Sequence, residues 1–267
     1  MLVADLLGKR TLAKNADRRP DYVCPNCRNA VILKAGRQVV WHFAHKPPTD
    51  CNWAKGETRE HLEAKQHFLE EFRSREIRAE VEFIVNTLPG DRRADVMLWS
   101  PNNRRFAIEL QHTNLSLEDI EARAQSYARA GIAQIWIPFL HRSVFEKAEL
   151  CSGGLLIERY APRPFERWVH GFHGKNGMWM YAPHTNELWH GFMVGHQRYV
   201  QESNWYEAGG EEMTAGGYSR WSKRYKDLTL HGPYSLSMLR LTKMRRRGAS
   251  LSHYSWPDAD LAYFEPR

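Results

Sequence analysis

The chain has 267 residues, 42% of them apolar, and a net charge of +7, values ordinary for a core-forming protein of one large or two to three small domains. No apolar run approaches the roughly 18 residues of a membrane helix. The N-terminal MLVADLLGKR is interrupted by Asp5 and by basic residues, unlike a signal peptide. Composition therefore excludes a membrane partner and predicts a cytoplasmic protein.

Positive charge is concentrated at the two ends of the chain. Residues 1–56 carry 10 lysines and arginines against 4 acidic residues, residues 57–150 carry 13 against 16, and residues 151–267 carry 15 against 11. Basic flanks suit a polyanion, because each neutralised phosphate releases counterions. Ordinary solvated surface charge produces the same modest excess. We predict three domains with these boundaries.

The first domain holds three of the four cysteines. Cys24 and Cys27 form CPNC, and Cys51 follows a predicted hairpin with strands at 30–34 and 38–43. Without a secretory signal, a disulfide framework is not expected. A Cys-x2-Cys pair followed by a hairpin and a second ligand pair is typical of small zinc ribbons and knuckles. The spacing predicts a structural Zn²⁺ site in domain 1–56.

The fourth zinc ligand is one of two histidines in HFAH. His45 is preferred, because it follows the strand and is nearer to Cys51. His42 is the alternative, since it lies inside the strand pattern, where packing or phosphate contact would also explain it. Cys151 stands alone and is predicted to be a buried apolar residue.

The sequence pattern of the middle domain predicts an α/β unit. Apolar residues recur at helical spacing over 56–75, and Ser116 and Gly131 suit the two ends of a second helix. Strands are predicted at 77–85, 94–99, 106–111 and 132–138, with turns at 89–91 and 100–105. The expected order is helix, three-stranded meander, helix, strand.

Two strands of this meander each carry one acid where the pattern favours an apolar side chain. If the hairpin turns about Asn102, Asp95 and Glu109 lie directly opposite each other, which is unfavourable for two like charges. A divalent cation between them would compensate. Solvent exposure at a sheet edge is the alternative, but their apolar neighbours argue against it. Gln111 points to the same face as Glu109.

The order of these motifs resembles the competence protein CoiA family, and more generally the PD-(D/E)XK, restriction-endonuclease-like nucleases. The motifs are CPNC at 24–27, HFAH at 42–45, ETREH at 57–61, RADV at 93–96, ELQ at 109–111 and IWI at 135–137. The resemblance covers about residues 20–140. It implies an α/β, restriction-endonuclease-like core flanked by a zinc-ribbon-like module and by the C-terminal domain.

The resemblance also implies roles for individual residues. Asp95 and Glu109 would bind Mg²⁺ or Mn²⁺, and Gln111 replaces the lysine of the wider superfamily. Glu57 and His61 lie one helical turn apart, and His61 would act as a base or orient a water, unless it is a structural histidine. Glu82, on the first predicted strand, would be an additional metal ligand or would support the metal ligands. The predicted contacts to nucleic acid in this domain are Lys65, Arg93, Arg123 and Tyr127, of which Arg123 and Tyr127 would alternatively brace the site.

The domain 151–267 is rich in aromatic residues and predicts a small antiparallel β module. Its tryptophans Trp168, Trp179 and Trp189 suit a core more than a base-stacking surface. Residues 235–247 are predicted to be helical and to end in a basic cluster that would contact phosphate: Lys243, Arg245, Arg246 and Arg247.

These features predict a magnesium-dependent deoxyribonuclease acting on single- or double-stranded DNA. Two alternatives remain open, and the missing superfamily lysine favours the first. One is a non-catalytic DNA-binding scaffold, and the other is a subunit that is active only with other DNA-processing or defence proteins. Oligomeric state, strand preference and endo- or exonuclease action are not determined by sequence.

Overall fold

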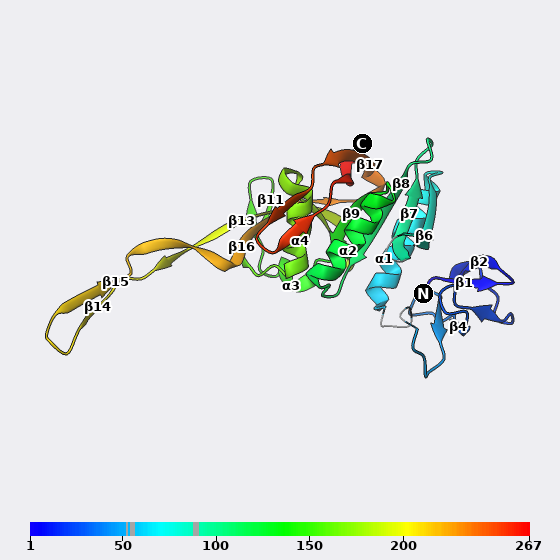
Figure 1. The fold of residues 1–267 in the computed structure, drawn as a ribbon, viewed down its shortest axis with the longest axis horizontal. Helices are drawn as coiled ribbons and strands as arrows, with labels where there is room; N and C mark the ends of the chain where they lie inside the picture. Colours follow the sequence, from blue (N-terminus) through cyan, green and yellow to red (C-terminus); the bar gives the residue numbers. More distant parts are fainter. Residues whose placement is uncertain (52, 54–56, 88–90) are drawn as a thin grey trace.

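The computed structural model describes residues 1–51, 53, 57–87 and 91–267. Its centre is a six-stranded sheet of order β17-β20-β9-β8-β7-β6 (Figure 1). Strands β6 (Arg78–Val85), β7 (Arg92–Trp99) and β8 (Arg105–Gln111) form the predicted antiparallel meander, and β9 (Ala133–Pro138) runs parallel to β8. Helices α1 (Arg59–Ser74) and α2 (Leu117–Arg129) lie where the spacing predicts them. The order of elements in the middle domain is confirmed.

Both faces of this sheet are buried. On one face, α1 packs Phe68 and Phe72 against strand residues such as Ile108. On the other face, α2 packs Ile120 against a core that includes Trp136. Burial on both sides explains why these strands are nearly continuous apolar runs. It also means that a carboxylate on either face must find a partner inside the protein.

The last segment of the chain completes this sheet. β17 (Leu239–Arg246) pairs antiparallel with β20 (Ala259–Pro266), and β20 pairs parallel with β9. The helix predicted over 235–247 is therefore wrong, apart from the single 3-10 turn η4 (Leu236–Met238). All of β17 pairs with β20 in unbroken register, from Leu239–Pro266 to Arg246–Ala259, which is the geometry of a strand. The strands on either side of residue 150 thus share one sheet.

A second sheet has the order β10-β11-β16-β13-β12. Its strands are β10 (Glu149–Cys151), β11 (Gly154–Tyr160), β12 (Met178–Ala182), β13 (Glu187–Val200) and β16 (Tyr218–Tyr234). The expected β-rich character and the burial of Trp168, Trp179 and Trp189 are confirmed. Cys151 is only half-buried at the end of β10, so the prediction of a buried residue is wrong.

Helix α4 (Pro164–His173) lies where short strands were expected. Pro164 occupies its first turn, and the carboxylate of Glu166 accepts a hydrogen bond from the backbone N–H of Arg163 at 2.7 Å. Both features favour a helix start. The remaining short elements are α3 (Arg142–Phe145), η3 (Gly174–Asn176), β18 (Ala249–Leu251) and β19 (Tyr254–Trp256).

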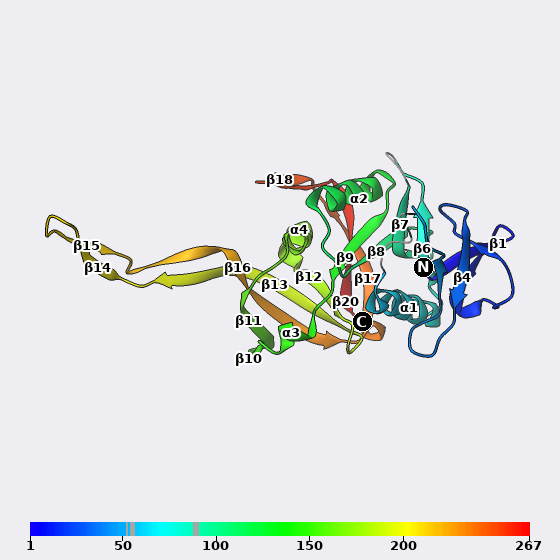
Figure 2. The ribbon, with the colours of Figure 1, turned by 90° about the horizontal axis from the view of Figure 1, so that it is seen from below.

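Strands β13 and β16 continue beyond the second sheet as a long two-stranded arm. The arm ends in the hairpin of β14 (Ser203–Tyr206) and β15 (Glu212–Ala215), far from the rest of the protein (Figures 1 and 2). No described helix combines the length and apolarity needed to cross a membrane.

The N-terminal region forms a separate sheet of order β2-β1-β3-β4-β5. Its elements are β1 (Val3–Leu6), β2 (Lys9–Leu12), η1 (Ala13–Asn15), β3 (Tyr22–Val23), β4 (Ala30–Lys34) and β5 (His42–His45). The strand at 30–34 is confirmed, whereas the second strand begins at His42 instead of 38. Pairing of Val31 with His45 sets this register. Pro89 and Gly90 of the predicted turn, and the boundary at residue 56, lie outside the described residues.

Candidate functional site

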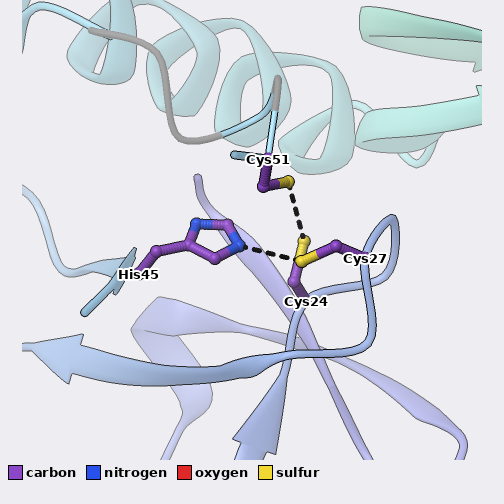
Figure 3. Close-up of side chains that lie close together, drawn as sticks. All are labelled: Cys24, Cys27, His45 and Cys51. Carbon is purple, nitrogen blue, oxygen red and sulfur yellow. Dashed lines mark hydrogen bonds between the residues drawn. The ribbon is translucent and has the colours of Figure 1, made fainter. Parts of the chain in front are cut away.

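Four side chains converge at the edge of the N-terminal sheet. The ligand atoms of Cys24, Cys27, His45 and Cys51 all lie within 4.8 Å of one another (Figure 3). The Sγ atoms of Cys24 and Cys51 are 3.9 Å apart, and Sγ of Cys27 is 3.3 Å from Nε2 of His45. Two thiolates on one tetrahedral zinc are separated by about 3.8 Å, given a Zn–S distance of about 2.3 Å. This Cys3His cluster can bind zinc.

Local backbone contacts shape the cluster. The backbone N–H of Cys24 donates to the carbonyl of Asn29, and that of Arg28 donates to the carbonyl of Cys24, so the CPNC turn folds back on itself. Nδ2 of Asn26 also lies 3.5 Å from Sγ of Cys51. His42 instead directs Nδ1 to its own neighbour, the carbonyl of Val40, at 2.9 Å. The geometry thus selects His45 as the fourth member.

The second candidate site lies on the β7–β8 hairpin. The observed register pairs Val96 with Ile108 and Met97 with Ala107, as expected for a turn at Asn102. The next step of this register would place Asp95 opposite Glu109. On β6, the pairs Val81–Val96 and Phe83–Ala94 leave Glu82 opposite Asp95 in the same way. Three buried acids therefore form a row across three neighbouring strands.

Glu109 is held by helix α2. The hydroxyl of Tyr127 donates to one carboxylate oxygen, and the guanidinium of Arg123 donates to the other. Burial raises the pKa of Glu109 to about 7; Arg123 opposes this rise, and the charge of Asp95 adds to it. Tyr127 is fully buried, so the prediction that it contacts nucleic acid is wrong, and it braces Glu109 instead. Arg123 keeps a side-chain exposure of 23% beside the same carboxylate.

Asp95 contacts helix α1 and the neighbouring strand. Its Oδ2 atom is 3.2 Å from Nε2 of His61 and accepts a hydrogen bond from the backbone N–H of Leu110 at 2.9 Å. Burial favours a higher pKa for Asp95, but the charge of His61 and its hydrogen bond, together with more distant cations, hold that pKa well below its usual range. Asp95 is thus a stable carboxylate beside an imidazole.

His112 is a site residue that the sequence reasoning missed. Its ring stacks on that of His61 with the centroids 4.5 Å apart. Burial, with the charge of His61, lowers the pKa of His112 to about 4, so this imidazole is neutral near pH 7. The only available sequence signal was its position directly after the ELQ strand.

A cavity of about 650 Å³ opens beside this histidine pair. Its lining includes Thr58, His112, Phe139, His141 and Arg142. His141 and Arg142 are exposed, and the sequence reasoning missed both, because they follow β9 and only the fold brings that end of the strand to α1. The cavity provides access from solvent to the His112 side of the site.

Glu57, Lys65, Glu82 and Arg93 form a buried ion network next to this row. The Nζ atom of Lys65 is 2.5 Å from Glu57 and 2.6 Å from Glu82. Arg93 reaches Glu57 at 3.3 Å, and its guanidinium lies over the ring of Trp53 at 4.6 Å. The N-terminal amine of Met1 also lies 3.0 Å from Glu57.

Two predictions fail in this network. Lys65 is fully buried between carboxylates, so it cannot contact nucleic acid. Glu57 precedes α1, whose N-cap is Thr58, so it does not share a helical face with His61 as expected. Its carboxylate nevertheless comes within 3.9 Å of Nδ1 of His61.

Glu82 connects the central sheet to the N-terminal module. Its φ of +52° is in the left-handed region that side chains rarely adopt. Its Oε2 atom accepts hydrogen bonds from the backbone N–H groups of Leu2 at 2.9 Å and Val3 at 3.2 Å. These bonds and Lys65 occupy its carboxylate, so Glu82 joins two parts of the protein.

Gln111 and three of the four C-terminal cations also make contacts within the protein. Nε2 of Gln111 donates to the carbonyl of Thr113 at 2.7 Å. Lys243 pairs with Asp260 at 2.7 Å, Arg245 with Asp258 and Asp260 at 3.6 Å, and Arg246 donates to the carbonyl of Phe172 at 2.7 Å. Alternation along β17 puts Lys243 and Arg245 on one face of the strand and Arg246 on the other, whereas Arg247 follows the strand and is exposed.

For the described residues, the Cys3His cluster is the one group of three or more Cys, His, Asp or Glu ligand atoms close enough to share an ion. Asp95 and Glu109 by themselves offer two buried carboxylates. Mg²⁺ is commonly bound by one or two carboxylates, with waters and substrate phosphates completing its shell. The donor chemistry of the hairpin therefore fits this ion.

Comparison with known proteins covers the first half of the chain. Residues 6–54 match the competence protein CoiA N-terminal domain, and residues 57–152 match the competence protein CoiA nuclease-like domain. Competence protein CoiA of Bacillus subtilis (strain 168) is 28% identical over 133 residues, which are 49% of this chain and 34% of that protein. No solved structure matches the chain. The chain therefore belongs to the competence protein CoiA-like family.

Proposed function

We propose that this protein is a metal-dependent nuclease that hydrolyses phosphodiester bonds in DNA. The observation that carries the proposal is the pair of buried acids, Asp95 and Glu109, one step beyond the last ladder pair Val96–Ile108 of the β7–β8 hairpin, with His61 against Asp95. The nuclease-like domain of the family supports it. So does the order of helix, meander, helix and strand, which is that of the restriction-endonuclease-like core.

Asp95 and Glu109 would hold Mg²⁺ or Mn²⁺. A bound ion of this kind lowers the pKa of a coordinated water and neutralises charge on the scissile phosphate. His61 lies at hydrogen-bond distance from Asp95, so its imidazole can orient a water or accept a proton there. Arg123 holds Glu109 in place, and its partly exposed guanidinium can also face a phosphate.

The Cys3His cluster would hold zinc as a structural ion. Because thiolates and imidazole provide a closed set of four ligands, no position is left for a substrate. Zinc would stabilise the N-terminal module, whose own core is small. This module packs against the acidic row through Glu82, so its folding supports the position of β6.

The test is cleavage of labelled single- and double-stranded DNA after exchange into buffer free of divalent cations and stepwise addition of Mg²⁺ or Mn²⁺. Zinc content is measured in parallel, so that loss of structural metal is not mistaken for loss of catalysis. Asp95→Asn and Glu109→Gln are expected to abolish cleavage while keeping the folded circular dichroism spectrum.

A matched control is Glu166→Gln. Glu166 is as buried as Glu109 and also pairs with an arginine, Arg163 at 2.6 Å, but it lies outside the hairpin. This variant should cut DNA like the wild type. The proposal is wrong if folded wild-type protein never cuts DNA with either metal, or if the hairpin variants keep full activity.

A non-catalytic DNA-binding scaffold is the second candidate. It is favoured by the occupation of Glu109 by Tyr127 and Arg123, and by Gln111 in place of a lysine. A scaffold would bind DNA equally well with Asp95→Asn and would cut it under no metal condition. Cleavage that appears only after addition of other DNA-processing proteins would instead indicate a partner-dependent subunit.

A further inference from the structure

The arm formed by β13 and β16 lies away from the acidic hairpin and carries a second group of charged and aromatic residues (Figures 1 and 2). In its ladder, Arg198 is the partner of Arg220, and Gln197 is the partner of Trp221. Nearer the body the register breaks between Gly195 and Gln197, where β16 bulges over residues 222–225. We call this region, residues 195–199 and 219–225, the shaft of the arm.

The shaft holds an unbalanced positive charge. Arg198 and Arg220 are directly opposite and exposed, and like charges in such a position are destabilising. Lys223 and Arg224 follow on the bulge and are exposed as well. Over the part of the chain that the structure describes, none of these four cations has a carboxylate within ion-pair distance. An anionic ligand would relieve their repulsion.

Asp227, the acid on β16 beside the groove, already has partners. Asp227 lies 2.7 Å from His196 and accepts a hydrogen bond from the backbone N–H of Arg159 at 3.1 Å. The cations line a groove of about 800 Å³, together with Trp221 and Tyr225. Tyr225 also stacks under the guanidinium groups of Arg159 and Arg224, at 5.1 and 5.3 Å. The groove therefore combines cations with aromatic rings.

Trp221 has the geometry of a stacking platform. A Cβ added at Gly195 would lie 2.8 Å from the indole ring, so the ring packs closely over this glycine. The side chain nevertheless remains 64% exposed. One side of the indole is thus supported by the backbone, and much of the rest is available to a flat partner. A nucleic-acid base is such a partner, and every base can stack in this way.

The tip of the arm has different chemistry. It is acidic, with Glu207, Glu211 and Glu212, and it exposes Trp205 and Tyr206. These acids would repel a phosphate backbone, so the tip is excluded from the same ligand. The cations and the supported aromatic ring coincide only in the shaft.

We infer that the shaft binds single-stranded nucleic acid, with Arg198, Arg220 and Lys223 on the phosphates and a base stacked on Trp221. A single strand is favoured over a duplex, because paired bases do not expose their faces to a protein side chain. Such a site would hold one part of a nucleic-acid strand while another part of the same strand lies elsewhere on the protein. It does not depend on the proposed nuclease activity.

The test is the binding of fluorescein-labelled dT20 to the full chain, followed by anisotropy without divalent cations and in the Asp95→Asn background, so that cleavage does not interfere. Trp221→Ala should weaken binding roughly 5- to 150-fold, as expected for one lost stacked base. The double variant Arg198→Ala/Arg220→Ala should reduce the slope of log K against log salt by about 1.4, or about 0.7 for each lost phosphate contact.

A matched control lies on the same arm. Tyr206→Ala removes a ring that is 71% exposed at the acidic tip, and it should bind dT20 like the parent protein. Equal loss with Tyr206→Ala, or unchanged binding by Trp221→Ala and the double arginine variant, would overturn the inference. So would competition by a blunt duplex that equals competition by unlabelled dT20. If Asp95→Asn binds dT20 like the wild type and Trp221→Ala weakens binding in that background, the site is supported even where nuclease activity is absent.

Discussion

Replacing Lys65 by methionine tests whether the ion network beside the acidic row is structural. The ammonium is fully buried and contacts Glu57 at 2.5 Å and Glu82 at 2.6 Å. Methionine fills a similar volume without the charge, so the main effect is to leave two carboxylates without this partner. Breaking a buried ion pair costs about 3–5 kcal/mol of unfolding free energy.

The loss of unfolding free energy should lie at the lower end of this range, because Glu57 keeps its ion pair with Arg93 at 3.3 Å. Glu82 keeps only backbone donors and carries most of the loss. The deficit of Lys65→Met should shrink as the pH falls towards about 4.5, since an unpaired buried carboxylate has a pKa raised above that value and takes up its proton on the way down. We therefore expect a loss of about 3 kcal/mol at pH 7.

The assay is equilibrium unfolding in urea, followed by circular dichroism with zinc present. Lys14→Met is the matched control, because Lys14 also contacts a carboxylate, Glu70 at 2.5 Å, but its side chain is 63% exposed. Exposed pairs contribute less than about 1 kcal/mol. The double variant Lys65→Met/Glu82→Gln should be less destabilised than the sum of the single variants. A loss for Lys65→Met as small as that for Lys14→Met would refute a structural role.

Three further predictions concern other parts of the protein. Cys51→Ser should reduce bound zinc from about one equivalent and lower the thermal midpoint, whereas His42→Ala should retain zinc; metal analysis after gel filtration separates the two. Tyr127→Phe removes a hydrogen bond to buried Glu109 and should cost about 1–3 kcal/mol of stability, measured by urea unfolding, with unchanged stability contradicting the assignment. Burial, with nearby cationic groups, lowers the pKa of His173 to about 3, below its unfolded value. The free energy of unfolding is therefore constant above about pH 6.5 and falls by about 2 kcal/mol by pH 5. His173→Phe should reduce this pH dependence. A wild-type protein without the pH dependence would show that this imidazole is solvated.

Much of the site was predictable from local patterns. Cysteine spacing identified Cys24, Cys27 and Cys51, since a tight turn between thiolates depends on only a few consecutive residues. Helix and strand periods predicted the middle domain, and alternation about Asn102 predicted the hairpin register, which pairs Val96 with Ile108 directly beside Asp95 and Glu109. These features depend on contacts between residues close in sequence.

The tertiary structure decided what depends on distant segments. Pairing between β17 and β20 converted a predicted helix into a strand of the central sheet, because the ladder bonds outweighed helical spacing. Burial by neighbouring elements changed Lys65 and Tyr127 from expected ligand contacts into supports for carboxylates, and it brought His112 against His61. The sequence by itself determined which residue types are available for chemistry. The packing of distant elements determined which of them face one another and which face solvent, because desolvation and pairing arise only when those elements meet.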